Sequence, residues 1–259
     1  MTASCASPAS VVADVRRAPT QDGAMLYDAS RVGNASPALF DANAWHAQGA
    51  LAAAGAGRGS AYFIDAGDRQ WVLRHYRRGG WAARFSADAY FWSGEERTRP
   101  FREWRLLREL HAAALPVPVP VAARYCRRGL TYRGDLITER IPNARPLSAL
   151  LQMGPLPVST WRDVGKCIRR FHAAGVCHAD LNAHNILLDD SQRVYVVDFD
   201  RGSRRAPGAW RAANLARLKR SLLKICRDLP GDRLENGVWT ALADGYDDSG
   251  VTHEAWRRR

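Results

Sequence analysis

The pattern of apolar and polar positions predicts strands in the first half of the chain and helices in the second. The segments GAGRGSAYFID (residues 55–65) and QWVLRHY (residues 70–76) are rich in aromatic and β-branched side chains, and the turn sequence AGDR joins them. Such a pair is typical of two neighbouring strands. Pro100 then opens a predicted helix over residues 101–113, since proline is tolerated in the first helical turn.

Prolines decide how the middle of the chain is interpreted. Three of them alternate with other residues at the start of LPVPVPVAARYCRRG (residues 115–129). Because proline lacks the N–H that a helix interior needs, this segment is expected to be an extended connector. DLITERI (residues 135–141) predicts a short strand, and PNARPLSALLQMGPLP (residues 142–157) predicts a linker.

Helical spacing begins at Ser159. Thr160 and Asp163 are spaced as a capping box, and apolar side chains recur on one helical face. These apolar positions are Trp161, Val164, Ile168 and Phe171. The predicted helix delivers the chain to the segment GVCHADLNAHN.

We therefore expect an α+β fold with two lobes. Residues 1–25 are small and polar and predict a loose N-terminal arm. Residues 26–140 predict an antiparallel-sheet N-lobe, and residues 141–259 a mainly helical C-lobe. A chain of 259 residues with 46% hydrophobic residues can bury a core of that size.

The net charge of +12 indicates an anionic partner, such as nucleic acid, acidic lipid head groups or a phosphorylated substrate. Only three of the 38 basic residues are lysine, and codon usage alone can produce that bias. The charge therefore constrains the sign of the partner and little else. Because no RNP, KH or zinc-finger pattern accompanies it, we expect no nucleic-acid partner.

Segment lengths and cysteine usage bear on location. No run of 18 apolar residues occurs, which argues against a membrane-spanning helix, and the first residues lack the basic and apolar regions of an export signal. The five cysteines form an odd set without a CxxC pair, which favours a reducing compartment. We expect a cytoplasmic protein.

The segment NILLDDSQRVYVVDFD predicts a hairpin that carries chemistry. Pairing ILL with YVV across the turn DSQR places Ile186 opposite Val197. In that register Asn185 lies opposite Asp198, with Cα atoms about 5 Å apart. A carboxamide oxygen and a carboxylate then converge, and such hard oxygen ligands suit Mg²⁺ carried in with a phosphate substrate. Asp180, five residues before Asn185, can supply a further carboxylate beside that pair.

HADLNAHN followed by DFD resembles the H-R-D-L-x-x-x-N and D-F-G pair of protein kinases, with both internal spacings retained. In that family the loop Asp accepts the proton of the substrate hydroxyl, while the Asn and the second Asp hold Mg²⁺. The resemblance implies that Asp180 is the catalytic base and that Asn185 and Asp198 are catalytic metal ligands. It also implies a bilobal protein-kinase-like fold that uses ATP.

The same resemblance assigns ATP-binding roles upstream. Gly55, Gly57 and Gly59 alternate between the two predicted strands, where backbone N–H groups can approach phosphate closely. Val72 and Arg74 share one strand face, and Arg74 occupies the place of the lysine in V-A-I-K. The planar fork of arginine can still neutralise α/β-phosphate charge, although with different geometry. A solvated strand arginine is the alternative.

Glu103 is the expected partner of Arg74. It shares a helical face with Leu106, Leu107 and Leu110, and a carboxylate on an apolar, inward face needs a cation. Glu96 and Glu109 are the rival candidates.

The residues just after DLIT are implied to form the adenine-binding hinge. Backbone groups around Glu139 and Ile141 would read the adenine edge, as the hinge does in kinases.

Two departures from the kinase pattern narrow the acceptor. Ala179 replaces the Arg of H-R-D, and no A-P-E follows before a new helix begins near Asn214. So short a segment leaves no room for a peptide-docking platform, which favours a small-molecule or lipid-linked acceptor. Asp200 replaces the glycine of D-F-G; it either adds a metal or substrate contact or only caps the next turn.

VLRHYRRGG, HADLNAHNILLD and DFDRG together resemble the 3-deoxy-D-manno-octulosonic acid (Kdo) kinases of the lipopolysaccharide-core branch, over residues 50–226. The resemblance implies ATP-dependent phosphorylation of the 4-hydroxyl of Kdo on an anionic lipid A precursor. It also implies peripheral association with the cytosolic face of the inner membrane. The charge of +12 suits such a substrate, which carries phosphates and a carboxylate.

Three alternatives remain open at this point. A core heptose kinase, or an aminoglycoside- or choline-type phosphotransferase, has similar loops. An inactive nucleotide-binding scaffold would fit Arg74 and Asp200, but the retention of Asp180, Asn185 and Asp198 opposes it.

Two stretches could contact lipid. The helix NLARLKRSLLKICRDL (residues 214–229) has an apolar face and a basic face, so it either lies on an anionic membrane or, as we favour, packs on its own core. An aromatic group forms either an acyl-chain surface or, as we favour, lobe packing: Trp81, Phe85, Tyr90, Phe91 and Trp92. His178 is interpreted as a structural loop histidine, because no zinc spacing surrounds it.

Overall fold

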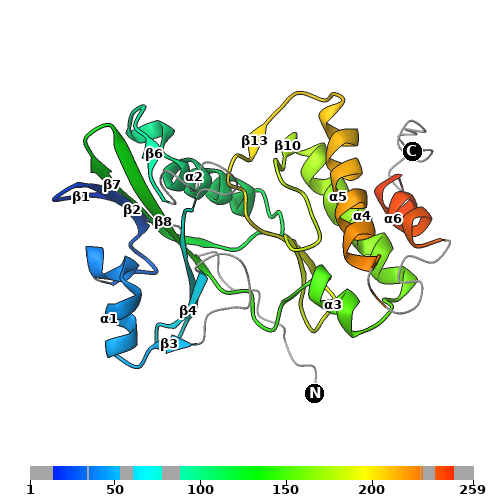
Figure 1. Cartoon of the computed structure of the whole chain (residues 1–259), viewed down its shortest axis with the longest axis horizontal. Coiled ribbons are helices and arrows are strands. Elements are labelled where there is room, and N and C mark those ends of the chain that lie inside the picture. Colours follow the sequence, from blue (N-terminus) through cyan, green and yellow to red (C-terminus); the bar gives the residue numbers. More distant parts are fainter. Residues whose placement is uncertain are drawn as a thin grey trace, which may run out of the picture. The chain divides into compact units, whose positions relative to one another are not determined.

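The chain divides into two compact units, which we describe separately (Figure 1). In a computed structural model, the described residues are 14–33, 35–52, 61–77, 88–227, 229 and 237–247. The first unit holds those up to Phe101 and Pro120–Glu139, and the second holds Arg102–Val119 and those from Arg140 onward. Within these residues, none of the helices combines the length and apolar character needed to span a membrane.

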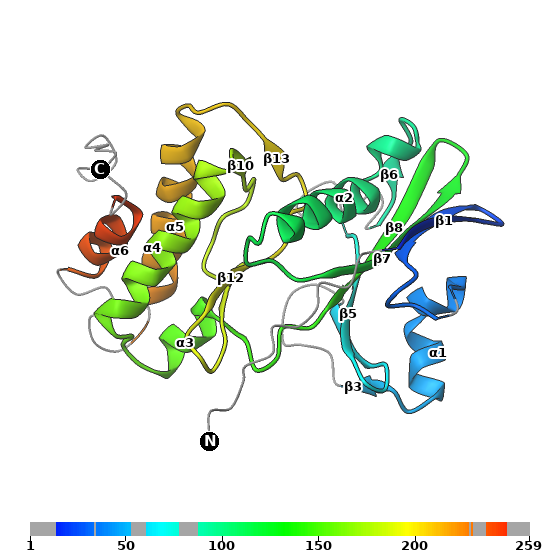
Figure 2. The same cartoon turned by 180° about the vertical axis from the view of Figure 1, so that it is seen from behind.

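An eight-stranded antiparallel sheet forms the first unit. Its strand order is β1-β2-β7-β8-β5-β4-β3, with β6 paired to β8 (Figures 1 and 2). The strands are β1 (Val15–Thr20), β2 (Gly23–Asp28), β3 (Leu51–Ala52), β4 (Ala61–Asp65), β5 (Gln70–His75), β6 (Tyr90–Phe91), β7 (Pro120–Arg128) and β8 (Thr131–Glu139). The helical segments are η1 (Pro37–Phe40), α1 (Ala42–Ala47), η3 (Glu95–Arg97) and the start of α2 (Arg99–Ala112).

The predicted loose arm over residues 1–25 is wrong for its second half. Residues 1–13 lie outside the described part, but β1 and β2 form a hairpin that extends the sheet beside β7. Gly23 allows β2 to approach β7 closely, since a Cβ at this position would lie 2.1 Å from the carbonyl oxygen of Tyr125. The absence of a side chain at Gly23 thus serves strand packing.

The proline-rich connector also ends in regular structure. Pro120 is the first residue of β7, a central strand of nine residues. The missing N–H of a proline is tolerated at a strand start, so Pro120 can begin the ladder opposite Thr138, and the other two prolines precede it.

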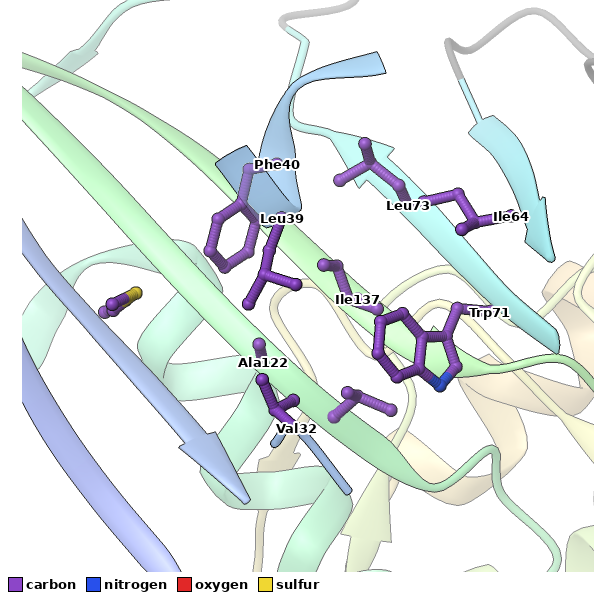
Figure 3. Packing of buried hydrophobic residues seen from close by; sticks show 10 residues of the cluster. Val32, Leu39, Phe40, Ile64, Trp71, Leu73, Ala122 and Ile137 are labelled. Carbon is purple, nitrogen blue, oxygen red and sulfur yellow. The ribbon is translucent and has the colours of Figure 1, made fainter. Parts of the chain in front are cut away.

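One face of this sheet carries a core that η1 and α1 help to cover (Figure 3). Figure 3 shows Leu39 and Phe40 facing side chains of β5 and β8, with Trp71 beside them. Trp71 also meets Trp45 of α1 edge to face, with 6.0 Å between ring centroids. The core comprises Met25, Val32, Leu39, Phe40, Ile64, Trp71, Leu73, Val121, Ala122 and Ile137.

The second unit is mainly helical, so the predicted α+β class is confirmed. Its helices are the continuation of α2, α3 (Leu147–Met153), α4 (Val158–Ala173), α5 (Trp210–Cys226) and α6 (Val238–Asp247). Its short strands are β9 (Arg145–Pro146), β10 (Val176–Cys177), β11 (Ile186–Leu188), β12 (Val194–Val196) and β13 (Ser203–Arg204).

Two local predictions in this unit are wrong. The predicted linker 142–157 contains β9 and α3, whose Leu147 and Leu151 are fully buried. The predicted capping box is absent, because the N-cap of α4 is Pro157, three residues before Thr160. Thr160 is instead inside the helix, buried, with its hydroxyl 3.5 Å from Gln192 Oε1.

Paired glycines let α4 and α6 pack closely, side by side in both views (Figures 1 and 2). A Cβ on Gly165 would lie 2.1 Å from the carbonyl oxygen of Leu242. A Cβ on Gly245 would lie equally close to the carbonyl oxygen of Arg162. The two backbones therefore touch where no side chain intervenes.

The apolar face of α5 is buried within this unit, as we favoured. Leu215, Leu218 and Leu222 are each at most 1% exposed. Of the predicted aromatic group, Trp81 and Phe85 lie outside the described residues. Tyr90 packs on Tyr132 with 5.6 Å between ring centroids, as we favoured, whereas Phe91 is 69% exposed.

Candidate active site

Side-chain hydrogen bonds hold the loop that follows β10. The main-chain carbonyl oxygen of Asp180 accepts hydrogen bonds from the amide groups of Asn182 (2.9 Å) and Asn185 (3.0 Å). Asn182 Oδ1 in turn accepts one from the backbone N–H of His184 (2.8 Å). Because the Asn185 amide nitrogen is engaged by the loop, its oxygen points away from that carbonyl.

His178 connects this loop to the segment that carries Asp198. Its Nδ1 accepts a hydrogen bond from the backbone N–H of Asp180 (3.1 Å), so the ring proton resides on Nε2. Nε2 donates to the carbonyl oxygen of Val197 (2.9 Å), the residue immediately before Asp198. Burial lowers the pKa of His178, which keeps this neutral tautomer at neutral pH.

The same histidine is anchored to its surroundings. Its backbone N–H donates to Asn214 Oδ1 on α5 (3.2 Å), and its ring meets Phe199 edge on, 4.8 Å between centroids. Phe199 is 1% exposed and packs on Phe171 of α4. These contacts agree with the interpretation of His178 as a structural residue.

The register of the predicted hairpin is wrong by one residue. Ile186 pairs with Val196, and the backbone N–H of Val197 donates to the carbonyl oxygen of Asn185 (3.0 Å). Asn185 therefore lies opposite Val197, and Asp198 lies one position beyond the ladder.

The turn explains this shift. The backbone N–H of Asp189 donates to the carbonyl oxygen of Arg193 (3.2 Å), leaving three residues in the loop, whereas the prediction assumed four. Gln192 takes a left-handed conformation with φ of 59°, and the Asp189 carboxylate accepts hydrogen bonds from the N–H groups of Ser191 and Arg193. A three-residue hairpin loop commonly places its last residue in this conformation.

Asp198 departs from regular strand geometry. Its φ of 65° lies in the left-handed region, which aspartate visits more readily than most residues. Such conformations concentrate at functional sites, where the surrounding structure holds them. Here the hydrogen bond from His178 to Val197 and the buried Phe199 fix the residues on either side.

The charged groups of the site gather around His178. The carboxylates of Asp198 and Asp180 raise the pKa of its ring against the larger effect of burial, and Arg217 lowers it. Both carboxylates thus lie close enough to His178 to affect its pKa, despite the changed register. No cluster of three His, Cys, Asp or Glu side chains occurs within the described ranges. The donors present here are an amide oxygen and a carboxylate, which suit a hard cation such as Mg²⁺ that keeps other ligands.

Arg217 of α5 is a site residue that the sequence did not single out. Its Nη1 lies 2.6 Å from Asp180 Oδ1. The sequence shows only that Arg217 belongs to the polar face of a helix 37 residues further on, and spacing does not reveal which polar residues reach the loop.

The predicted ATP-binding residues of the first unit lie on β5 and β8. Val72 and Arg74 are half-buried on β5, opposite Thr138 and Leu136 of β8. The Arg74 guanidinium lies over the ring of Tyr76, 4.9 Å from its centroid, and Nη2 is 3.3 Å from the Tyr76 hydroxyl. Gly55, Gly57 and Gly59 lie outside the described residues.

The predicted hinge residues lie at the end of the sheet. Glu139 ends β8, and its carboxylate forms ion pairs with Arg31 and with Arg69 (3.4 Å). Ile141 belongs to the second unit, where its carbonyl oxygen accepts a hydrogen bond from the N–H of Ala144 (3.4 Å).

Glu103 is buried in α2, with 3% exposure, whereas Glu96 and Glu109 are exposed. Burial favours Glu103 over its rivals, because a buried carboxylate needs a partner. Glu103 and Arg74 belong to different units, so their pairing stays a prediction.

Fold and loop chemistry together define a kinase-like phosphotransferase. The chain belongs to the lipopolysaccharide kinase (Kdo/WaaP) family, whose model matches residues 42–246. It is therefore an enzyme, and the alternative of an inactive scaffold is not supported.

Curated relatives cover most of the chain. It is 50% identical over 204 residues to the 3-deoxy-D-manno-octulosonic acid kinase of Xanthomonas campestris pv. campestris (strain B100), which covers 78% of this chain and 81% of the relative. It is 49% identical over 206 residues to the enzyme of that name in Stenotrophomonas maltophilia (strain K279a), covering 78% and 81%. The enzyme of that name in Xylella fastidiosa (strain 9a5c) is 47% identical over 206 residues, covering 79% and 82%.

Proposed function

We propose that this enzyme transfers the γ-phosphate of ATP to the 4-hydroxyl of Kdo on a lipid A precursor. The observation that carries the proposal is about 50% identity to enzymes named Kdo kinases over four fifths of each chain. The loop supports the same chemistry, because the carboxylates of Asp180 and Asp198 both act on the buried ring of His178, and the Asn185 amide group donates to the Asp180 carbonyl oxygen.

In the proposed mechanism Asp180 acts as the base. A carboxylate that is 59% exposed can reach an incoming sugar hydroxyl, and Asp180 then accepts its proton as the hydroxyl oxygen attacks the γ-phosphorus. The bond from that phosphorus to the β–γ bridging oxygen breaks, and ADP leaves. His178 holds the Asp180 backbone and takes no proton, since its Nδ1 already accepts a hydrogen bond.

Asn185 Oδ1 and the Asp198 carboxylate would hold Mg²⁺, which neutralises charge on the phosphates. Arg74 would contact the α/β-phosphates, with Gly55, Gly57 and Gly59 and the backbone near Glu139 and Ile141 completing the nucleotide site. Glu103 would pair with Arg74.

We place the enzyme in the cytoplasm, peripherally bound to the inner membrane where its lipid acceptor resides. The net charge of +12 supports attraction to an anionic bilayer. Cosedimentation with vesicles containing anionic lipid, and its loss at high salt, would test this placement.

The proposed function is tested by replacing the base. Asp180→Asn should lower kcat at least about a thousandfold, since it removes proton acceptance, while Mg²⁺-dependent ATP binding measured by calorimetry persists. Asp190→Asn is the matched control, because Asp190 is an exposed aspartate at the hairpin turn of the same unit.

The acceptor is tested separately with labelled ATP and a panel of lipids bearing Kdo, bearing heptose, or lacking both. Phosphate transfer to the Kdo lipid alone is the expected result, and NMR of the product locates the modified hydroxyl. Transfer to heptose instead would replace the acceptor, and wild-type turnover in Asp180→Asn would remove Asp180 from the base role.

A further inference from the structure

The ion pair between Arg217 and Asp180 is unusual in its setting. The Arg217 side chain is 49% exposed and that of Asp180 is 59% exposed, and exposed ion pairs contribute little to stability. A structural purpose therefore accounts poorly for an arginine placed against the proposed catalytic base.

The contact uses only part of the guanidinium. Nη1 alone meets Asp180 Oδ1, although arginine offers five N–H donors in a planar fork that suits two carboxylate oxygens at once. Among the described residues Arg217 has no second carboxylate partner. The other N–H groups of the guanidinium can donate hydrogen bonds to another planar anion beside Asp180.

We propose that Arg217 binds the carboxylate of the acceptor sugar and is a specificity-determining residue of this enzyme. The inference rests on the proposed function, in which the acceptor is an octulosonic acid and so carries a carboxylate. A sugar acid approaching Asp180 meets a like charge, and an arginine in contact with both carboxylates offsets that repulsion.

The same contact orients the acceptor. A bidentate arginine fixes the plane of a carboxylate, so the sugar ring is held at a set angle to Asp180. A neutral sugar of similar size would lack this anchor, which gives the site a means to select an acid.

Binding and turnover of two acceptors test the proposal: free Kdo and its methyl ester, which lacks the negative charge. With wild-type enzyme we expect Kdo to bind at least about tenfold more tightly than the ester. Arg217→Gln should raise the Kd and KM of Kdo by about that factor and leave those of the ester and of ATP unchanged. Arg217→Lys keeps the charge but loses the planar guanidinium, so its Kd and KM for Kdo should lie between those of the wild type and those of Arg217→Gln.

Arg220→Gln is the control for loss of general charge, because Arg220 is exposed one turn along α5 and has no carboxylate partner among the described residues. It should bind Kdo as the wild type does. Matching circular dichroism and unfolding curves would show that each variant is folded.

The outcomes separate this proposal from the proposed function. If Arg217→Gln lowers kcat equally for Kdo and ester and changes neither affinity, Arg217 only positions Asp180 and the proposal is overturned. Wild-type enzyme that binds Kdo through Arg217 without phosphorylating the Kdo lipid would refute the proposed function alone.

Discussion

His172 should make the stability of the second unit fall in mild acid. The side chain lies at the end of α4 with 2% exposure, and its Nδ1 is 2.9 Å from the Tyr246 hydroxyl of α6. The ring of Trp210 meets it edge on at 5.0 Å. Burial lowers the pKa of His172 from 6.5 to about 4; hydrogen bonding with Asn214 opposes this, and the charge of Arg211 adds to it.

The magnitude follows from proton linkage. Between pH 6.5 and about 4 the unfolded chain binds a proton at His172 that the folded chain does not, so stability decreases as the pH falls through this window. Relative to pH 7.5, the loss from this histidine alone amounts to about 2 kcal/mol at pH 5. That is a large share of the 5–15 kcal/mol typical of a folded domain.

Urea unfolding at pH 7.5, 6 and 5, followed by circular dichroism, measures this loss. Other groups also titrate in this range, so the difference between wild type and His172→Gln isolates the contribution of His172. The variant should lose about 2 kcal/mol less than the wild type on going from pH 7.5 to pH 5. His111→Gln, at an exposed position at the end of α2, should keep the wild-type pH dependence.

The reasoning fails if the variant and the wild type lose equal stability over this range. Equal losses would mean that His172 accepts its proton in the folded state without cost, which its burial and the neighbouring arginine oppose.

Two further substitutions test the packing and the hairpin. Gly165→Ala should lower the free energy of unfolding in urea by about 1–3 kcal/mol, because the new Cβ would meet the carbonyl oxygen of Leu242, and this outweighs the better helix propensity of alanine. Gly33→Ala is the control, because nothing lies within 4 Å of a Cβ at that position. Equal stability of the two variants would contradict the close contact between α4 and α6. Gln192→Gly should stabilise by about 1 kcal/mol in the same assay, because glycine adopts a positive φ without strain, and a destabilised variant would argue against the three-residue turn.

Local patterns predicted several of the elements correctly. The alternation in QWVLRHY became β5, and the apolar spacing from Trp161 to Phe171 became α4 with all four positions buried. The N-terminal prediction failed because a contact between strands far apart in the sequence outweighed the local preference for a loop. Gly23 and its small neighbours look like a loose arm, but the same lack of side chains lets β2 approach β7 closely.

The candidate site could be proposed from the sequence because its chemistry depends on short spacings. Asp180, Asn185 and Asp198 lie within 20 residues, so a motif can identify them without the fold. Arg217 was not predictable, since several basic residues share the polar face of its helix and only the packing of α5 decides which one meets Asp180.

Residue types, spacings and the resemblance to kinase motifs were thus enough to indicate an α+β phosphotransferase and to single out the residues proposed as its base and oxygen ligands. Tertiary structure alone decided the pairing of Asn185 with Val197, the tautomer of His178 and the partner of Asp180. The physical reason is that a one-residue change of register or a rotation of a helix hardly changes the local conformational free energy. A few buried hydrogen bonds and packed rings, such as those of His178 and Phe199, then favour one arrangement over the others.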